Sequence, residues 1–116
     1  ERDIVGHVRT IAPRFQQIFQ SLAERPLVGE VRGVGLMAGI ELVSDKASKQ
    51  PFDLALKVGS YLMMRARELG LIVRAIGDTV VCAPPLIITE DEIDELGARF
   101  HQAVADTEAR FLKDAA

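Results

Sequence analysis

One charged side chain interrupts a long apolar stretch of the sequence. Arg74 lies within LIVRAIGDTVVCAPPL, which runs from Leu71 to Leu86. Its guanidinium group presents a planar fork of N–H donors that matches a carboxylate, and such a pair is strong and well oriented in a partly dry pocket. From the residues alone, two interpretations stay open. Either Arg74 lies at a sheet edge and pairs with Asp or Glu, which the spacing favours, or it binds an organic anion.

Other reactive side chains lack the neighbours that metal binding or catalysis needs. His7 and His101 lie in amphipathic helices near opposite ends of the chain, and we interpret both as surface or half-buried helix residues. Cys82 lies in an apolar strand, where a free cysteine behaves as a small inert hydrophobe. The acidic run Glu90–Glu95 suits the positive end of a helix dipole better than a metal ion.

Neither the serines nor the lysines are placed for covalent catalysis. A serine nucleophile needs a base beside it, and a Schiff-base lysine needs a desolvated site that lowers its pKa. The serines without a base beside them in sequence are Ser44, Ser48 and Ser60. The lysines fall in a polar loop, a helix and the C-terminal end: Lys46, Lys49, Lys57 and Lys113. The sequence therefore predicts no catalytic residue, no cofactor-binding residue and no metal ligand in this chain.

The composition predicts one globular domain without a nucleic-acid or membrane partner. Its 116 residues are 48% hydrophobic and 27% charged, with a formal net charge of −3, which is typical of a single folded domain over 1–116. This charge does not attract nucleic acid or anionic lipid, and no apolar run approaches the ~20 residues that span a bilayer. The single cysteine excludes an internal disulfide and fits a reducing, cytoplasmic compartment. Because the first residue is not methionine, we expect the chain to come from a longer protein.

A leading amphipathic helix is expected over residues 1–25. Its apolar residues recur at alternating steps of four and three, which is the pattern of one buried helix face. Pro13 should kink this helix or mark a restart, and Pro26 should end it. The apolar positions are Ile4, Val8, Ile11, Phe15, Ile18 and Leu22.

The core of the domain is expected over 27–113 and begins with a glycine-rich stretch from Val28 to Val43. This stretch holds too many glycines for a helix, so we expect two strands joined around Gly33–Gly35, with Gly39 as a bulge or close backbone approach. It is not a phosphate-binding loop, because another apolar strand follows it instead of a helix.

A middle helix is expected over 54–69. Asp53 is placed to accept a hydrogen bond from its first turn, as N-cap residues do. Gly70 lies where a left-handed residue ends a helix.

The remaining chain predicts a strand pair and a final helix. Gly77 and Asp78 form a two-residue turn between two apolar strands, and Thr89 with Glu92 forms a capping box at the start of the last helix. The order is therefore α-ββ-α-ββ-α. This order predicts an α+β fold with a small antiparallel sheet of about four strands covered by helices.

Two motifs together resemble a known family. VRGVGLMAGIELV, followed by GLIVRAIGDTVVCAPPLIITEDEIDEL, is similar to the C-terminal segment of class III aminotransferases, the ω-aminotransferase group of pyridoxal-phosphate enzymes. The resemblance implies the small C-terminal domain of a fold-type I enzyme. It also implies that a larger preceding domain holds pyridoxal phosphate and the catalytic lysine, so this chain alone should be inactive. The expected partners are that large domain and the second subunit of a homodimer.

The resemblance also implies a role for one residue. The position that matches Arg74 belongs to an arginine that binds the substrate carboxylate. Acetylornithine and ornithine relatives carry an arginine where this chain has Val81, so we expect pyruvate or a similar oxo acid as acceptor and a primary amine or ω-amino acid as donor. Two other functions stay open: a stand-alone small-molecule-binding or regulatory module, and a dimerisation domain that uses the helix over 3–23.

Overall fold

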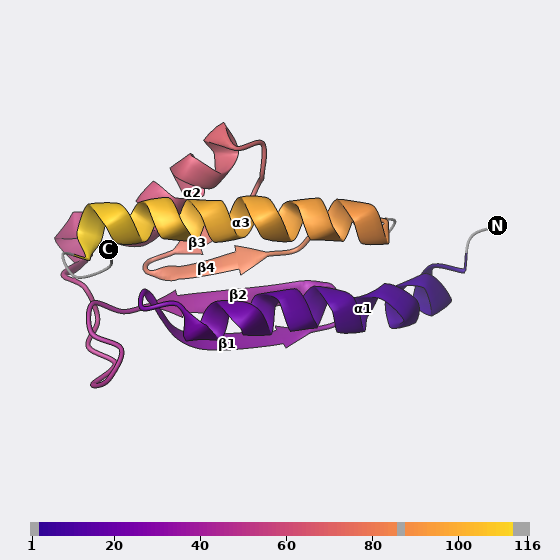
Figure 1. Ribbon diagram of the computed structural model, residues 1–116, viewed down its shortest axis with the longest axis horizontal. Helices are drawn as coiled ribbons and strands as arrows, with labels where there is room; N and C mark the ends of the chain where they lie inside the picture. The colour runs from indigo at the N-terminus through magenta and orange to yellow at the C-terminus, as the bar shows by residue number, and fades with distance from the viewer. Residues whose placement is uncertain (1–2, 86–87, 113–116) are drawn as a thin grey trace.

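A computed structural model describes residues 3–85 and 88–112. Within these residues the chain forms three α-helices and one four-stranded antiparallel sheet (Figure 1). The predicted α+β class and element order are confirmed, with two short 3₁₀ turns added. The elements are α1 (Ile4–Ser21), η1 (Leu22–Glu24), β1 (Val28–Val34), β2 (Met37–Leu42), η2 (Leu54–Leu56), α2 (Val58–Glu68), β3 (Arg74–Ile76), β4 (Thr79–Cys82) and α3 (Glu90–Phe111).

The helices cover one face of the sheet and leave the other face open. The strands follow the order β1-β2-β4-β3, and α1 and α3 lie side by side along the sheet (Figure 1). Helix α2 packs on α3 and on the β3–β4 hairpin. Because side chains alternate between the faces of a strand, every second residue of the two central strands is buried under the helices. These residues are Ala38, Ile40, Leu42, Val80 and Cys82.

The predicted apolar face of α1 is largely buried. Ile11, Phe15 and Leu22 lie in the core, and the helix runs without a break through Pro13. Ile4 is an exception, because it is 42% exposed. Phe19, which the spacing did not include, is fully buried. The cluster continues through Phe19 to Phe100 of α3, with ring centroids 5.0 Å apart.

In the first strand pair, the observed turn overlaps the predicted one only at Gly35, and the bulge expected at Gly39 was wrong. Strand β1 extends to Val34, and the turn falls after it, where Gly35 has a φ of 58°. The irregularity in the β1–β2 ladder lies between Val28 and Glu30, whereas Gly39 pairs regularly with both neighbouring strands. The glycine that the turn requires is the one with positive φ, since only that backbone conformation strains other residues.

The start of the middle helix also differs from the prediction. Asp53 accepts a hydrogen bond from Ala55 N at 3.0 Å, but this bond closes η2 and not α2. Lys57 then turns left-handed with a φ of 52°, and α2 begins at Val58. Gly70, with a φ of 86°, follows the end of α2 as predicted.

The predicted signals of the second half of the chain are confirmed. Gly77 and Asp78 form the turn between β3 and β4, and the capping box of Thr89 and Glu92 opens α3. Lys113 and the outer limits of the predicted domain lie outside the described residues. In the described part, none of the helices combines the length and apolarity that a membrane span requires.

Candidate functional site

Arg74 is the first residue of β3, which is an edge strand bonded to β4 alone. The side chain is exposed. None of the ion pairs formed by residues 3–85 and 88–112 includes it. The edge location suggested by the spacing is therefore correct, but the pairing with an internal Asp or Glu is not found in the described chain. As far as the described residues go, the Arg74 guanidinium is open to contact with an external anion.

The strand register places Arg74 on the open face of the sheet. Residues that face each other across antiparallel strands project from the same side. Arg74 is the partner of Val81, which in turn is the partner of Gly39. Gly39 pairs with Arg32 on β1, so the row crosses all four strands. Val80, which precedes Val81 on β4, is fully buried under the helices. Val81 and the rest of the row therefore face away from the helices.

A shallow hollow lies on this open face; Arg74 is not part of its lining, but its strand partner Val81 is. Gly39 and Val81 form part of its lining, and Gly39 contributes no side chain to fill it. Arg32 borders the hollow too, but its guanidinium contacts Glu30 at 3.1 Å and Glu41 at 3.7 Å. The complete lining consists of Arg32, Gly33, Val34, Met37, Ala38, Gly39, Thr79 and Val81. A mostly apolar hollow, one strand away from an arginine that forms no ion pair within the described residues, suits a small organic acid.

The chain alone leaves this site incomplete. An exposed ion pair contributes ~1 kcal/mol or less in water, because solvent screens both charges. The same pair becomes stronger when a second surface excludes water. Arg74 therefore needs another protein surface opposite the sheet before it can hold a carboxylate firmly.

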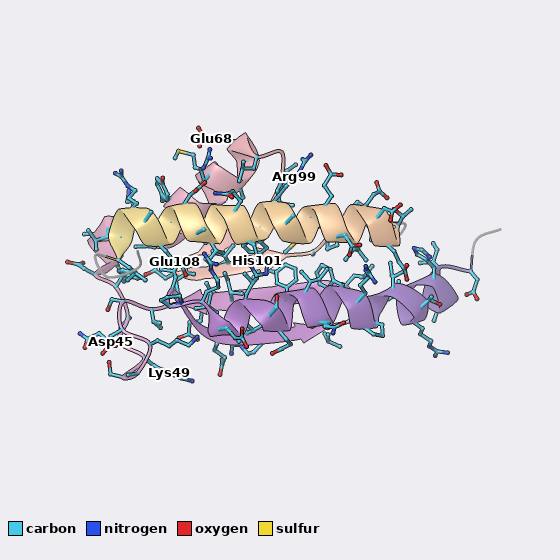
Figure 2. The ribbon with its side chains drawn as sticks, in the orientation of Figure 1. Asp45, Lys49, Glu68, Arg99, His101 and Glu108 are labelled. Atoms are coloured by element: carbon cyan, nitrogen blue, oxygen red, sulfur yellow. The ribbon has the colours of Figure 1, made fainter. Side chains whose placement is uncertain are left out.

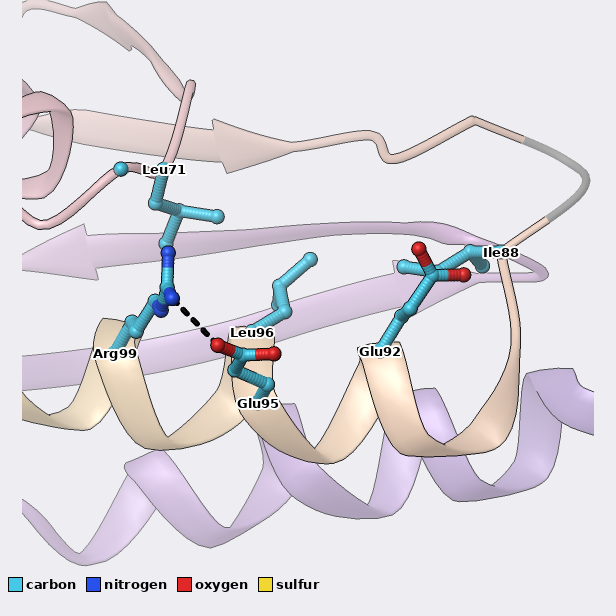
Figure 3. A pocket seen from close by; sticks show the side chains of 7 residues that line it. Leu71, Ile88, Glu92, Glu95, Leu96 and Arg99 are labelled. Carbon is cyan, nitrogen blue, oxygen red and sulfur yellow. Dashed lines mark hydrogen bonds and ion pairs between the residues drawn. The ribbon is translucent and has the colours of Figure 1, made fainter.

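A second hollow lies between the end of α2 and the start of α3 (Figure 3). Its arginine, Arg99, donates to the carbonyl oxygen of Leu69 at 3.0 Å and to Glu95 at 2.5 Å. A lysine or arginine that bonds the last carbonyls of a helix stabilises its end. Arg99 thus has a structural task at the C-terminus of α2, and Glu92, another charged residue of the lining, accepts a hydrogen bond from Thr89 N–H in the capping box of α3.

Both histidines have structural partners. His7 is half-buried, and its Nε2 lies 2.7 Å from the carbonyl oxygen of Ile88, which ties α1 to the segment before α3. His101 is also half-buried, with its Nε2 3.0 Å from the hydroxyl of Ser21. Burial and the nearby charge of Arg25 lower the pKa of His101. No group of three or more metal-ligating side chains converges within residues 3–85 and 88–112.

The acidic run at the start of α3 also has structural partners. Glu92 accepts from the backbone N–H of Thr89, which lowers the pKa of its carboxyl. Asp94 accepts two hydrogen bonds from Arg14 at 2.7 Å, and these lower its pKa. Glu92 has the helix-stabilising role that the sequence favoured, whereas Asp94 joins α3 to α1.

Cys82 is buried, as expected for a small apolar residue. Burial raises the pKa of its thiol to about 12 from an ordinary value of 9.0. At about pH 8 the folded chain should therefore hold roughly a thousandfold less thiolate than the unfolded chain, and iodoacetamide should label the folded chain correspondingly slowly. Equal labelling rates with and without urea would contradict this prediction.

The same pKa shift of Cys82 means that the free energy of unfolding falls as pH rises from 9.0 toward about 12, since the thiol of the unfolded chain ionises first.

Two residues with tertiary roles were missed by the sequence reasoning. Glu108 is only 4% exposed, and its carboxylate accepts from Arg25 at 2.7 Å and from the backbone N–H of Leu27 at 3.3 Å. Figure 2 shows Glu108 and His101 on the side of α3 toward α1. The sequence held one signal of this burial: Glu108 lies four residues after Val104, on the apolar face of the last helix. The second is Asp78, which bonds to the start of α2, and nothing in its local sequence indicated that contact.

Comparison with known proteins identifies close relatives. Residues 1–104 match the family Aminotransferase class-III. The chain is 41% identical over 110 residues to gamma-aminobutyrate transaminase 1, mitochondrial, of Oryza sativa subsp. indica, covering 95% of this chain and 21% of that protein. It is 37% identical to gamma aminobutyrate transaminase 3, chloroplastic, of Solanum lycopersicum, with the same two coverages.

The fold is also shared with a solved aminotransferase structure. A pyridoxal-phosphate-bound aminotransferase mutant from Vibrio fluvialis superposes with a TM-score of 0.90 and 41% identity, over 93% of this chain and 24% of that one. The chain thus spans between a fifth and a quarter of the length of these relatives.

Proposed function

Since the chain belongs to the class III aminotransferase family, we propose that it is the C-terminal small domain of a longer transaminase. That enzyme transfers an amino group from a primary amine or ω-amino acid to an oxo acid such as pyruvate. The observation that carries this proposal is the exposed, unpaired Arg74 on the open face of a domain that covers only about a quarter of its relatives. Arg74 binds the carboxylate of the oxo acid and orients its carbonyl group.

The cofactor belongs to the remainder of the protein in this proposal. Class III aminotransferases use pyridoxal phosphate, and the Vibrio fluvialis structure contains it. The described lysines of this chain are placed for other tasks. Lys46 donates to the carbonyl oxygens of Ala23 and Arg25. Lys49 lies in the turn after β2, Lys57 lies between η2 and α2, and both have positive φ. The proposal therefore assigns the cofactor, its lysine and its phosphate-binding groups to the large domain, and expects the isolated chain to be inactive.

The acceptor preference follows from the neighbour of Arg74. Val81 lies directly across from it on β4 and presents an apolar side chain to the same face. A second arginine at this position would favour a substrate with a second carboxylate. With Val81 there, the site suits an oxo acid with one carboxylate and a small apolar remainder.

The proposed partners are the large domain of the same protein and the second subunit of a homodimer. The open sheet face has the character of a covered surface, since Val34, Met37 and Ile76 are 77%, 54% and 70% exposed there. Val34 and Met37 are neighbours across β1 and β2, and Ile76 lies apart from them on β3. Exposed apolar surface of this kind marks interaction surfaces. The proposal also places the enzyme in the cytoplasm, because a single buried cysteine fits a reducing compartment. Fractionation of the source cells tests this location. The names of the plant relatives give mitochondria and chloroplasts as the alternatives.

The test uses the complete product of the gene that contains this chain. The purified protein is supplied with a primary amine, and the cofactor absorbance is followed before and after addition of pyruvate. Conversion of the bound cofactor by the amine and its return with pyruvate are the expected results. A gene that encodes no upstream large domain, or a product that binds no pyridoxal phosphate, would instead support a stand-alone binding module or a dimerisation domain.

The isolated 116-residue chain is expected to self-associate at high concentration. Its open face exposes Val34, Met37 and Ile76, which residues 3–85 and 88–112 leave uncovered. Replacing Val34 and Ile76 with lysine should restore the monomer. Met64, which is 49% exposed on α2, provides the control, because Met64→Lys leaves the open face unchanged. Sedimentation velocity measures the result, and a clean monomer of the unaltered chain at high concentration would contradict the prediction.

A further inference from the structure

The strand that carries Arg74 is short and lies at the edge of the sheet, and the buried Val73 directly precedes Arg74. Strand β3 has three residues and pairs with β4 alone, and Arg74 is its first residue. The three ladder pairs of β3 run from Arg74 to Ile76, next to the turn. The position of Arg74 therefore depends on the packing of Val73 before it and on how the β3–β4 turn after it is fixed.

Asp78 fixes that turn to two other elements. Its carboxylate oxygen Oδ1 accepts a hydrogen bond from the backbone N–H of Gly59 at 3.1 Å, in the first turn of α2. Its backbone carbonyl oxygen accepts from the N–H of Leu42, at the end of β2, at 2.9 Å. One turn residue thus joins the hairpin to the helix layer and to the centre of the sheet.

The helix needs this contact as much as the hairpin does. Lys57, at the N-cap of α2, makes no side-chain hydrogen bond to the helix. The N–H groups of a first helical turn have no partner within the helix, and a carboxylate near them also interacts favourably with the helix dipole. Asp78 therefore supplies from the hairpin the cap that Lys57 does not provide. Its second oxygen, Oδ2, is buried without a hydrogen-bond partner in the described chain.

The helix and the turn also touch directly. Gly59 is buried, and a Cβ atom added there would lie 2.2 Å from the carbonyl oxygen of Gly77. Real Cβ atoms do not approach a backbone oxygen so closely, so any side chain at this position pushes the turn away from α2. The contact leaves the hairpin no room to shift toward the helix while the Asp78 bond prevents it from moving away.

From these contacts we propose that Asp78 is a positioning residue for Arg74. By bonding the turn to the start of α2, Asp78 fixes the position of β3 at the edge of the sheet. The Arg74 guanidinium is then directed to the oxo-acid carboxylate. This inference rests on the proposed function, since it requires that Arg74 bind that carboxylate. Loss of the bond should let the hairpin move and misplace the fork, and a displacement of about 1 Å at a binding group can cost up to roughly a hundredfold in catalysis.

The experiment is a double-mutant cycle in the complete protein. The variants are Asp78→Ala, Arg74→Ala and the two combined, with Asp78→Asn as the conservative change that keeps an acceptor oxygen for Gly59. Asp3→Ala is the matched control, because Asp3 caps α1 through Gly6 N at 2.9 Å and lies at the start of α1. The measurements are the KM for pyruvate, kcat, and the rate at which an amine donor without a carboxylate converts the bound cofactor.

Asp78→Ala should raise the KM for pyruvate about tenfold and leave the amine step within about twofold. Asp78→Asn and Asp3→Ala should stay near the unaltered protein. In the Arg74→Ala background, Asp78→Ala should have no further effect on the pyruvate KM, because residues that act through one another are not additive. If the increases in pyruvate KM of the two single variants multiplied in the double variant, the role of Asp78 would be overturned and the role of Arg74 would remain. A pyruvate KM that does not respond to Arg74→Ala would instead overturn the proposed function.

A second variant keeps the inference testable if Asp78→Ala does not fold. Gly59→Ala retains the Asp78 carboxylate and gains helix propensity, yet its new methyl group displaces the turn at Gly77. It should raise the pyruvate KM as Asp78→Ala does while the amine step stays unchanged. An unaltered pyruvate KM in Gly59→Ala would show that the position of the turn does not control Arg74.

Discussion

Replacing Arg74 with alanine in the complete enzyme should raise the KM for pyruvate about a hundredfold, which corresponds to ~3 kcal/mol of lost carboxylate binding. The reason is that Arg74 is exposed on the open face and, within the described chain, forms no ion pair that could compete with the substrate. The amine step with a donor that lacks a carboxylate should change little. Steady-state kinetics for the acceptor, and single-turnover kinetics for the donor, separate the two effects.

Two further variants give this result its meaning. Arg74→Lys keeps the charge but loses the planar fork, so we expect a KM between those of the unaltered protein and Arg74→Ala. Arg67 is an exposed arginine of α2 on the helix side, and Arg67→Ala removes one positive charge without touching the open face. If both alanine variants raised the pyruvate KM equally, the effect would come from net charge and not from a specific contact.

Replacing Glu108 with alanine should lower the free energy of unfolding of the chain by about 3 kcal/mol, as expected for the loss of one partner of a buried ion pair. The Glu108 side chain is 6% exposed, and that of Arg25 is 31% exposed. Removing the carboxylate leaves the Arg25 charge and the buried N–H of Leu27 without their acceptor. Urea unfolding of the chain at low concentration, followed by circular dichroism, measures the loss.

The controls for Glu108 distinguish charge from hydrogen bonding. Glu108→Gln should cost less than Glu108→Ala, because the amide oxygen still accepts from Leu27 N. Asp94→Ala breaks an equally short ion pair with Arg14, but both of those side chains are about half exposed. Its effect should be much smaller, since solvent screens an exposed pair. Equal shifts of the unfolding midpoint in Glu108→Ala and Asp94→Ala would contradict a special role for the buried pair.

The features that the sequence predicted correctly depend on neighbours a few residues apart. The capping box of Thr89 and Glu92 and the left-handed Gly70 are set by interactions within one or two turns of chain. The Gly77 turn is equally local, because its positive φ of 60° needs only the right residue at the right place. These signals were sufficient to predict the order of helices and strands and hence the α+β class. Where two local signals competed, as with Gly33 and Gly35, the prediction was wrong by two residues.

The tertiary structure alone decided what the charged residues do. The bond from Gly59 to Asp78 joins residues 19 apart in sequence, and the pair of Arg25 and Glu108 joins residues 83 apart. No local pattern specifies such contacts, because they arise only after the helices have packed on the sheet. The same holds for Arg74: its type and spacing allowed both a paired edge residue and an anion-binding group. Only the strand register placed it on the uncovered face without a carboxylate partner, because side chains alternate between faces and one step of register would have buried it.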